Sequence, residues 1–383
     1  MLITIMASKQ ITKKASRQCF ILVVAAMALI SGCAAQGAKR VPRDRFDYNA
    51  ALAQSTREQM LLNIVRSRYL EVPVFLTVSS VLTQYEYDSS IGLTGILEFG
   101  RGTTDRAAGD TNLRFSERPT ITYLPIEGQE FSAHLLADVP VDLFFAAAQA
   151  GWSVDVFMRI GIQRLGAAEN MSFAEVPAAG YGDSKSPFAD EFKKLKRFER
   201  MIELIFILSD SEVIEVQEAE ENGKDVRYLL IAEEVPEDLR PMLDELRQLI
   251  GLANRNRFRI TQRVANLKDD EISIQTRSVM AMMEFMARGV EAPIAYLEEG
   301  RVIAHGLQSS EGEAAKGLIP FRMRSSKNRP ENVFAKVRYQ DYWYYIDHND
   351  ITSKRALSLI IVLFRLMAPT PAGAAPILTL PTG

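Results

Sequence analysis

The stretch Val81-Leu-Thr-Gln-Tyr-Glu-Tyr-Asp-Ser-Ser-Ile-Gly-Leu-Thr-Gly-Ile-Leu-Glu-Phe99 alternates in polarity from one residue to the next. Its odd positions carry mostly valine, tyrosine, isoleucine, leucine and phenylalanine, whereas its even positions from Gln84 onward are mainly polar. Successive residues of a β-strand point to opposite faces, so a period of two predicts a long strand with one apolar and one polar face.

A second segment suited to a β-strand follows a loop that contains several glycines. The loop covers 100–110, and the segment at 112–126 completes a predicted antiparallel hairpin over 81–126. Such a hairpin can pack on the protein's own helices, or it can face a membrane as part of an oligomeric barrel, whose strands also alternate. Four residues of the return segment break the alternation and weigh against the barrel: Arg114, Glu117, Arg118 and Pro119.

The N-terminus has the composition of an export signal. The apolar run 20–30 follows four basic residues, and no acidic residue occurs before Asp44. A basic segment, an apolar core and a small-residue cleavage site together predict a signal peptide over 1–32 that is removed from the mature protein. The core is shorter than the roughly 20 apolar residues that a membrane-spanning helix needs.

Ile30-Ser31-Gly32-Cys33 directly follows this core and resembles the lipobox of bacterial lipoproteins. The resemblance implies cleavage between Gly32 and Cys33, acylation of Cys33 and attachment to the cell envelope. In lipoproteins of this kind, an aspartate directly after the acylated cysteine keeps the protein at the inner membrane. This chain has Ala34 at that position, so the resemblance favours the outer membrane, facing the periplasm. The alternative is a chance cysteine beside an ordinary secretory signal. Because Cys19 lies in the predicted signal, the mature chain contains no internal disulfide.

The net charge limits the classes of partner. The chain of 383 residues carries a formal charge of −3, and removing the four positive charges of the predicted signal leaves −7. This mild acidity gives no support for nucleic-acid binding, which needs a basic surface. The lipobox resemblance implies a membrane as the first partner. Other envelope proteins and further copies of the chain are expected as additional partners.

The rest of the chain predicts an α+β fold with mostly antiparallel strands. Helical and alternating segments mix without the regular strand–helix–strand repeat of a doubly wound sheet. A flexible tether is predicted at 33–46, a helix at 47–69, and a strand, with a helix as the alternative, at 152–165.

Two folded units are predicted, 47–165 and 187–367, with a boundary in the segment 166–186, which is rich in alanine, glycine and serine. The second unit ends in a ββ(β)α arrangement, with strands near 319–324, 333–339 and 342–346 before a final helix. The tail 368–383 contains several prolines and predicts an extended segment that is disordered or adds a strand to a partner.

Sequence motifs for catalysis, cofactors or metals are missing. The three histidines, His134, His305 and His348, lack metal-site spacing, and neither a nucleotide-binding glycine loop nor a nucleophile elbow occurs. We therefore predict no catalytic residue, no cofactor and no metal. The cluster Asp347-His348-Asn349-Asp350 leaves two interpretations open. His348 can act as a general base oriented by an aspartate, or the cluster can supply turn and capping residues.

A group of basic residues precedes an aromatic segment near the C-terminus. If both share one face, they would suit an acidic sugar, a lipid head group or a protein partner; otherwise they are solvated residues around a turn. The candidate binding residues are Arg322, Arg324, Lys327, Arg329, Trp343 and His348.

These features together predict a lipid-anchored bacterial envelope protein that acts as a non-catalytic binding or scaffold subunit in the periplasm. Two alternatives stay open. One is an oligomeric outer-membrane lipoprotein that forms a pore or collar through the hairpin at 81–126. The other is a periplasmic enzyme that acts on envelope polymers.

Overall fold

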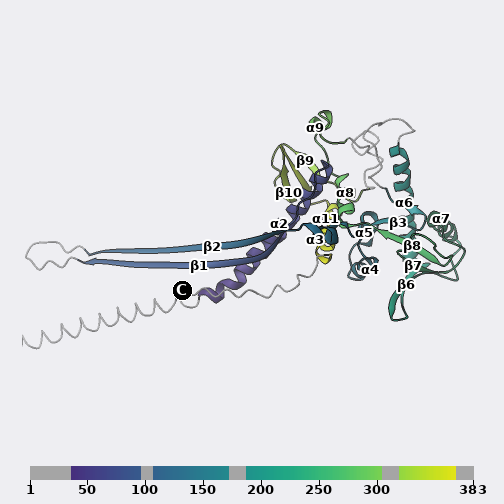
Figure 1. Ribbon diagram of the computed structural model, residues 1–383, viewed down its shortest axis with the longest axis horizontal. Coiled ribbons are helices and arrows are strands. Elements are labelled where there is room, and N and C mark those ends of the chain that lie inside the picture. The colour runs from purple at the N-terminus through teal and green to yellow at the C-terminus, as the bar shows by residue number, and fades with distance from the viewer. Residues whose placement is uncertain (1–35, 96–106, 172–186, 304–318, 368–383) are drawn as a thin grey trace, which may run out of the picture. The chain divides into compact units, whose positions relative to one another are not determined.

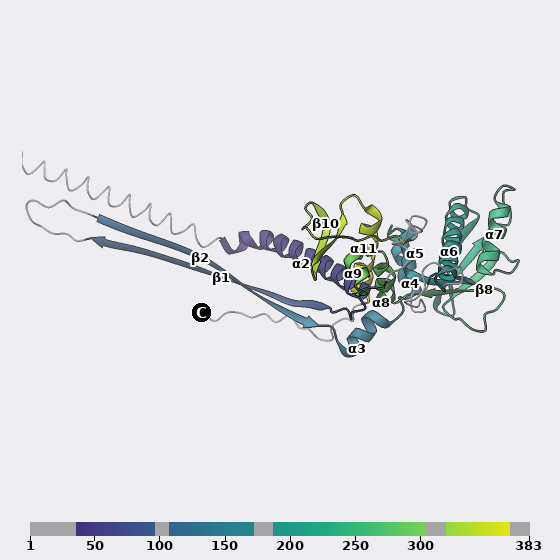
Figure 2. The same ribbon diagram turned by 90° about the horizontal axis from the view of Figure 1, so that it is seen from above.

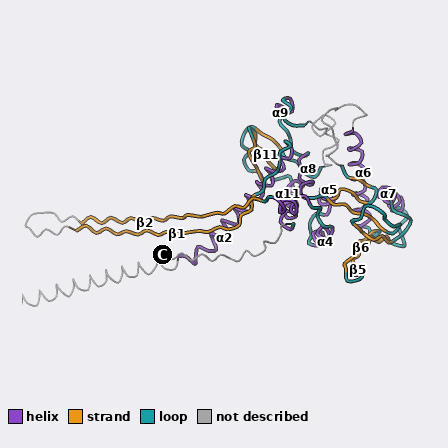
Figure 3. Tube along the Cα trace, in the orientation of Figure 1, coloured by secondary structure: helices purple, strands orange, loops and turns teal. Residues whose placement is uncertain are grey.

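The computed structural model describes residues 36–95, 107–171, 187–303 and 319–367 (Figures 1 and 3). The predicted signal peptide, Cys33 and the tail 368–383 lie outside the described residues. The chain divides into two units between Glu58 and Gln59, and each unit is described by itself. Helices and mostly antiparallel sheets confirm the predicted α+β class.

Helix α2 (Gln36–Arg68) crosses the boundary between the two units. Its residues up to Glu58 are the described part of the first unit, and its residues from Gln59 onward belong to the second unit. The helix begins at Gln36, so the prediction of a flexible tether is wrong for the residues between Gln36 and Phe46. Alanine, glutamine, lysine and arginine in this stretch favour a helix, whereas Gly37 and Pro42 disfavour one, so composition alone did not decide between a helix and a flexible tether. From Met60 onward the buried residues recur at helical spacing, as predicted: Met60, Leu61, Ile64 and Val65.

The predicted hairpin is confirmed as β1 (Leu76–Gly95) and β2 (Ala107–Pro125), which pair antiparallel over their whole described length. One irregularity in the register, between Val78 and Ser80, interrupts the ladder near its base. Both views show the two strands side by side (Figures 1 and 2). Among the described strands, β1 and β2 pair only with each other.

A larger sheet joins segments of the two predicted units, 47–165 and 187–367. Its strand order in the described part of the chain is β4-β3-β8-β7-β6-β5, antiparallel throughout except for the parallel pair β7–β8. The strands are β3 (Ile162–Leu165), β4 (Ala168–Glu169), β5 (Ile214–Glu221), β6 (Lys224–Ile231), β7 (Arg257–Thr261) and β8 (Glu271–Thr276).

The pairing of β3 with β8 corrects the predicted boundary at 166–186. Ile162 lies opposite Thr276 and Leu165 opposite Ile274, so hydrogen bonds cross from the predicted first unit to the predicted second unit. Composition suggested a linker, but β4 falls inside it and extends the same sheet. Asn222 and Gly223 form the turn between β5 and β6 with φ values of 54° and 72°, the positive values that favour an Asn-Gly pair in a tight hairpin.

The segment predicted as a strand at 152–165 is a helix over most of its length. Helix α5 (Val154–Gly161) precedes β3, and its buried residues include both Val156 and Phe157. A strand with one buried face would not bury two neighbours, whereas this short helix is packed against α6, α8 and α11. Those helices are α6 (Pro187–Asp210), α8 (Val279–Ala287) and α11 (Ile351–Leu366).

The other described helices are short and flank the sheets. They are α3 (Gly128–Phe131), the π-helix η1 (Ser132–Leu136), α4 (Val141–Gln149), α7 (Arg240–Ile250) and α9 (Ile294–Glu298). Gly151 follows α4 with φ 82°, a left-handed conformation that glycine often adopts just after a helix.

The C-terminal ββ(β)α unit is confirmed, with its first strand shifted along the chain. Strands β9 (Arg324–Ser326), β10 (Val333–Tyr339) and β11 (Tyr342–Asp347) form a sheet in the order β10-β11-β9, and α11 follows. Tyr344 of β11 is fully buried. This sheet belongs to the same continuous hydrophobic core as the larger one, which runs from Met60 to Phe364.

Candidate functional site

The outer face of the β10-β11-β9 sheet brings aromatic and basic residues together. In β11 the buried residues Tyr344 and Ile346 alternate with the half-buried Trp343 and Tyr345, which therefore point to the opposite face. The strand register adds basic neighbours on both sides. We call this set the basic–aromatic face: Arg324, Arg329, Lys336, Arg338, Trp343 and Tyr345.

Tyr345 is flanked by Lys336 on β10 and by Arg324 on β9, while Trp343 lies opposite Arg338. Directly opposite residues of antiparallel strands share a face, so these cations and rings form one surface. The Arg329 guanidinium lies 5.5 Å from the centre of the Trp343 ring, within the range of a cation–π interaction. The face can therefore offer positive charge and flat apolar area to the same ligand.

The partners of these cations leave a positive balance on the face. Arg324 pairs with Asp347 at 2.9 Å, and the Lys336 ammonium donates to the carbonyl of Pro330 at 2.7 Å. Arg338 is exposed. Of the described acidic side chains, Asp347 is the one that pairs with a member of this face. The remaining positive charges favour an anionic ligand.

The structure brings three of the six predicted binding residues onto this face, namely Arg324, Arg329 and Trp343. Lys327 lies 5.8 Å from the ring of Tyr342, which alternates with Trp343 along β11 and belongs to the opposite face. Arg322 pairs with Glu291 at 3.6 Å, so it is directed to a different partner. Sequence reasoning missed Lys336 and Arg338. Their alternation with the buried Ala335, Val337 and Tyr339 was the signal that could have found them.

His348 lies at the end of β11, and its ring is 6.4 Å from that of Phe334. Either aspartate of the cluster could have oriented His348, but both have other partners. Asp347 pairs with Arg324, and Asp350 caps α11 by accepting hydrogen bonds from the Ser353 backbone N–H at 3.0 Å and from its hydroxyl at 2.6 Å. The cluster thus has the turn and capping geometry that was one of its two interpretations.

Buried tyrosines hold the inner side of the sheet against the end of α2. The hydroxyls of Tyr69 and Tyr344 lie 2.5 Å apart, and the Tyr339 hydroxyl donates to Glu71 at 2.6 Å. Burial raises the pKa of both Tyr344 and Tyr339 above the ordinary value, so both hydroxyls stay protonated. These rings support the sheet and add no negative charge beneath the basic–aromatic face.

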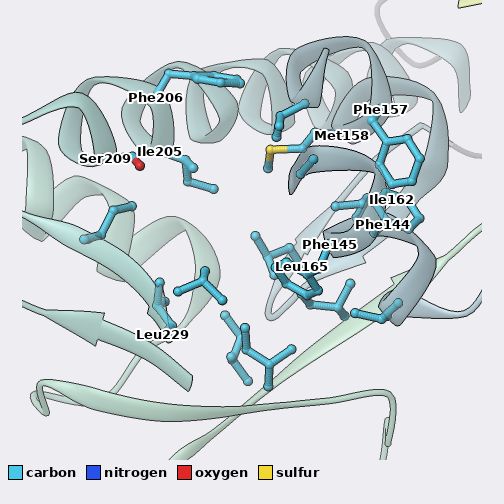
Figure 4. Close-up of a pocket in the computed structure, with 18 of the residues that line it drawn as sticks. Phe144, Phe145, Phe157, Met158, Ile162, Leu165, Ile205, Phe206, Ser209 and Leu229 are labelled. Carbon is cyan, nitrogen blue, oxygen red and sulfur yellow. The ribbon is translucent and has the colours of Figure 1, made fainter. Parts of the chain in front are cut away.

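A second candidate site is an apolar cavity of about 300 Å³ between the large sheet and helices α4, α5 and α6 (Figure 4). Figure 4 shows Phe144 and Phe145 from α4, Ile205 and Phe206 from α6, and Leu229 from β6 around it.

Within the described residues, no helix is long and apolar enough to cross a membrane, and no group of three histidine, cysteine or acidic residues could hold a metal ion. Comparison with protein-family models, curated proteins and solved structures yields no match.

Proposed function

We propose that this protein is a lipid-anchored, non-catalytic binding or scaffold subunit of the bacterial cell envelope, held at the outer membrane and facing the periplasm. The lipobox resemblance at Ile30-Ser31-Gly32-Cys33 supports the anchor. The observation that carries the binding role is the basic–aromatic face, because it gathers positive charge on a chain that is acidic overall.

The chemistry of this face suits an anionic partner with an apolar or planar part. Cations beside tryptophan and tyrosine rings can bind a charged group and cover a flat or apolar surface at once. An acidic sugar, an anionic head group and an acidic protein segment share this chemistry. Binding by such a face requires no nucleophile and no general base.

Photo-crosslinking in living cells tests this role. Placing p-benzoylphenylalanine at position 343 is expected to yield a crosslinked product on irradiation, whose mass identifies the partner class. Reversing two charges with Arg329→Glu and Arg338→Glu should lower the yield roughly tenfold, equivalent to about 1.4 kcal/mol of binding. The same photoprobe at exposed Gln248 on α7 is the matched control. Equal yields at positions 343 and 248 would contradict the proposal.

The hairpin supports a second candidate function, the oligomeric pore or collar. Its register places Arg114 opposite Asp88 and Arg118 opposite Gln84. These arginines, which appeared to break the alternation, therefore pair with positions of the polar series of β1, whereas Tyr87 pairs with Phe115. Glu117 and Pro119 pair with Tyr85 and Thr83, two positions of the apolar series.

The length of the ribbon also favours self-association. β1 contains 20 residues, and two-stranded hairpins are marginally stable in water without further packing. Long unpaired strand edges readily accept another strand. Among the described strands, both outer edges of this ribbon are unpaired. A further copy of the chain would supply strands of matching length for both edges.

Particle mass in detergent tests the oligomer. We expect the wild-type chain to elute as an assembly of several copies, measured by light scattering. Ile91→Asp with Leu93→Asp, on the apolar face, should reduce it to a monomer. Ser90→Asp with Thr94→Asp adds the same charge to the polar face and should leave the assembly intact. A wild-type monomer at all concentrations would rule out the oligomeric function while leaving the role of the basic–aromatic face standing.

A further inference from the structure

We infer that the cavity between the large sheet and helices α4, α5 and α6 binds a single, electrically neutral hydrocarbon chain, such as an acyl chain of a lipid. This site is separate from the basic–aromatic face and adds a ligand to the proposed function. The inference rests on the size of the cavity, the chemistry of its wall, its entrance and the charges around it.

The wall of the cavity is almost purely apolar. Apart from Ser153, Ser209 and Glu215, every described residue that lines it is aliphatic or aromatic, or is a methionine. An apolar cavity of ~150 Å³ stays free of water and binds benzene. The volume of about 300 Å³ is twice as large, which gives room for roughly a dozen carbon atoms by the same comparison. Water would gain few hydrogen bonds there, whereas a methylene chain would bury its surface.

Part of the solvent-exposed lining is apolar as well. Val154, Phe206 and Val216 line the cavity, yet they are 38%, 38% and 39% exposed, so the apolar lining reaches the surface. Large apolar side chains at this exposure give a hydrocarbon chain from a lipid surface apolar groups to contact as it enters. An elongated ligand can enter one end first and leave its polar end outside.

The charges near the cavity exclude an anionic end group. Glu215 belongs to the lining. Arg227 lies 4.8 Å from the ring of Phe145, another lining residue. It is already paired with both Asp142 and Glu218. These three carboxylates outnumber the one guanidinium, so a neutral polar end is favoured over a carboxylate or phosphate.

The positions of the two tryptophans allow a direct test, because the chain contains only these two. Trp152 lines the cavity, whereas Trp343 lies on the basic–aromatic face. The full chain with Trp343→Phe, held in nonionic detergent, therefore reports the cavity through Trp152 alone. We expect 12-bromododecan-1-ol to quench this fluorescence saturably as its mole fraction in the micelles is raised.

A matched pair of variants on α4 locates the site. Ala147 lines the cavity and is half-buried, whereas Ala146 is exposed and does not line it. In the Trp343→Phe background, Ala147→Phe is expected to fill the space and weaken quenching at least tenfold, and Ala146→Phe to leave it unchanged. Far-UV circular dichroism checks that both variants fold.

Charge selectivity gives a second measurement that does not depend on Ala147→Phe folding. At a pH where it is ionised, 12-bromododecanoate should bind at least tenfold more weakly than the neutral alcohol. The inference would be wrong if 12-bromododecan-1-ol did not quench Trp152 saturably, or if it quenched Trp343 equally in a Trp152→Phe chain. A competition measurement adds a third check, in which unbranched alcohols without bromine should displace the bromoalcohol and restore the fluorescence. Displacement by an apolar peptide but not by these alcohols would also overturn the inference.

Discussion

Replacing Arg277 by methionine is expected to lower the free energy of unfolding by ~4 kcal/mol, because it leaves backbone carbonyls without a donor, at ~1–3 kcal/mol for each one that stays buried and unpaired. Arg277 is buried at the end of β8, and its guanidinium lies 4.4 Å from the ring of Phe285. It donates to four backbone carbonyls, those of Arg159, Ile160, Ile162 and Met171, at 3.3, 2.9, 3.3 and 2.7 Å respectively.

These carbonyls lie where α5 passes into β3 and at the end of the described segment that follows β4. Helix ends leave carbonyl groups without intrahelical partners, and buried unpaired carbonyls are costly. Methionine fills the space but donates no hydrogen bond. Arg277→Lys keeps the charge but loses the fork of donors, so the free energy of unfolding of this variant should lie between those of the wild type and Arg277→Met.

Urea unfolding followed by circular dichroism measures the change. Arg240→Met is the control, because Arg240 is exposed and donates to the carbonyl of Val235. We expect the control to alter stability by less than about 0.5 kcal/mol. An Arg277→Met protein within about 1 kcal/mol of the wild type would show that the four carbonyls find other partners.

The protonation state of Arg277 gives a further test. Burial lowers the pKa of Arg277 below the ordinary arginine value. The four carbonyl acceptors oppose this shift, because they favour the charged form that donates to them. Since arginine side chains stay protonated in folded proteins, the stability difference between wild type and Arg277→Met should be the same at pH 8 and pH 10.

Gly166→Ala is the second change with a large expected effect, about 3 kcal/mol of lost stability from left-handed backbone strain plus overpacking. Gly166 joins β3 to β4 at φ +56°, where an L-residue is disfavoured. A Cβ atom there would also collide with the carbonyl oxygen of Ile250, at the end of α7. That carbonyl accepts from the Ala167 N–H at 2.9 Å and cannot move away freely.

Gly223→Ala separates the two causes of this effect. Gly223 has φ +72°, but no atom lies within 4 Å of the position of an added Cβ. Its substitution should cost about 1 kcal/mol, the backbone strain alone. Thermal and urea unfolding of both variants measure the difference. Equal losses for the two variants would show that the approach of Ile250 to Gly166 contributes nothing.

Local patterns were sufficient for much of the fold. The period of two in 81–126 predicts a hairpin because strand geometry depends on neighbouring residues. Asn222-Gly223 predicts the turn between β5 and β6 for the same reason. The predicted strand at 152–165 failed because valine, methionine and isoleucine at alternate positions are equally compatible with a short helix buried on several sides.

The candidate sites were predicted less completely. The basic cluster near 322–329 and Trp343 were found from composition, but Lys336 and Arg338 required the register of β10 with β11. The cavity has no signature along the chain, since its wall comes from α4, α5, α6 and several strands. Arg277 likewise appears in the sequence as one arginine among many.

The sequence by itself determined the predicted export and acylation signal, the hairpin and the class of the fold, because each depends on order and composition over a short stretch. The tertiary structure decided that β3 pairs with β8 across a segment that resembled a linker, which residues share the basic–aromatic face, and where the cavity lies. Those features arise from contacts between residues far apart in the chain, and the packing and pairing energies that select them are not recorded in any local pattern.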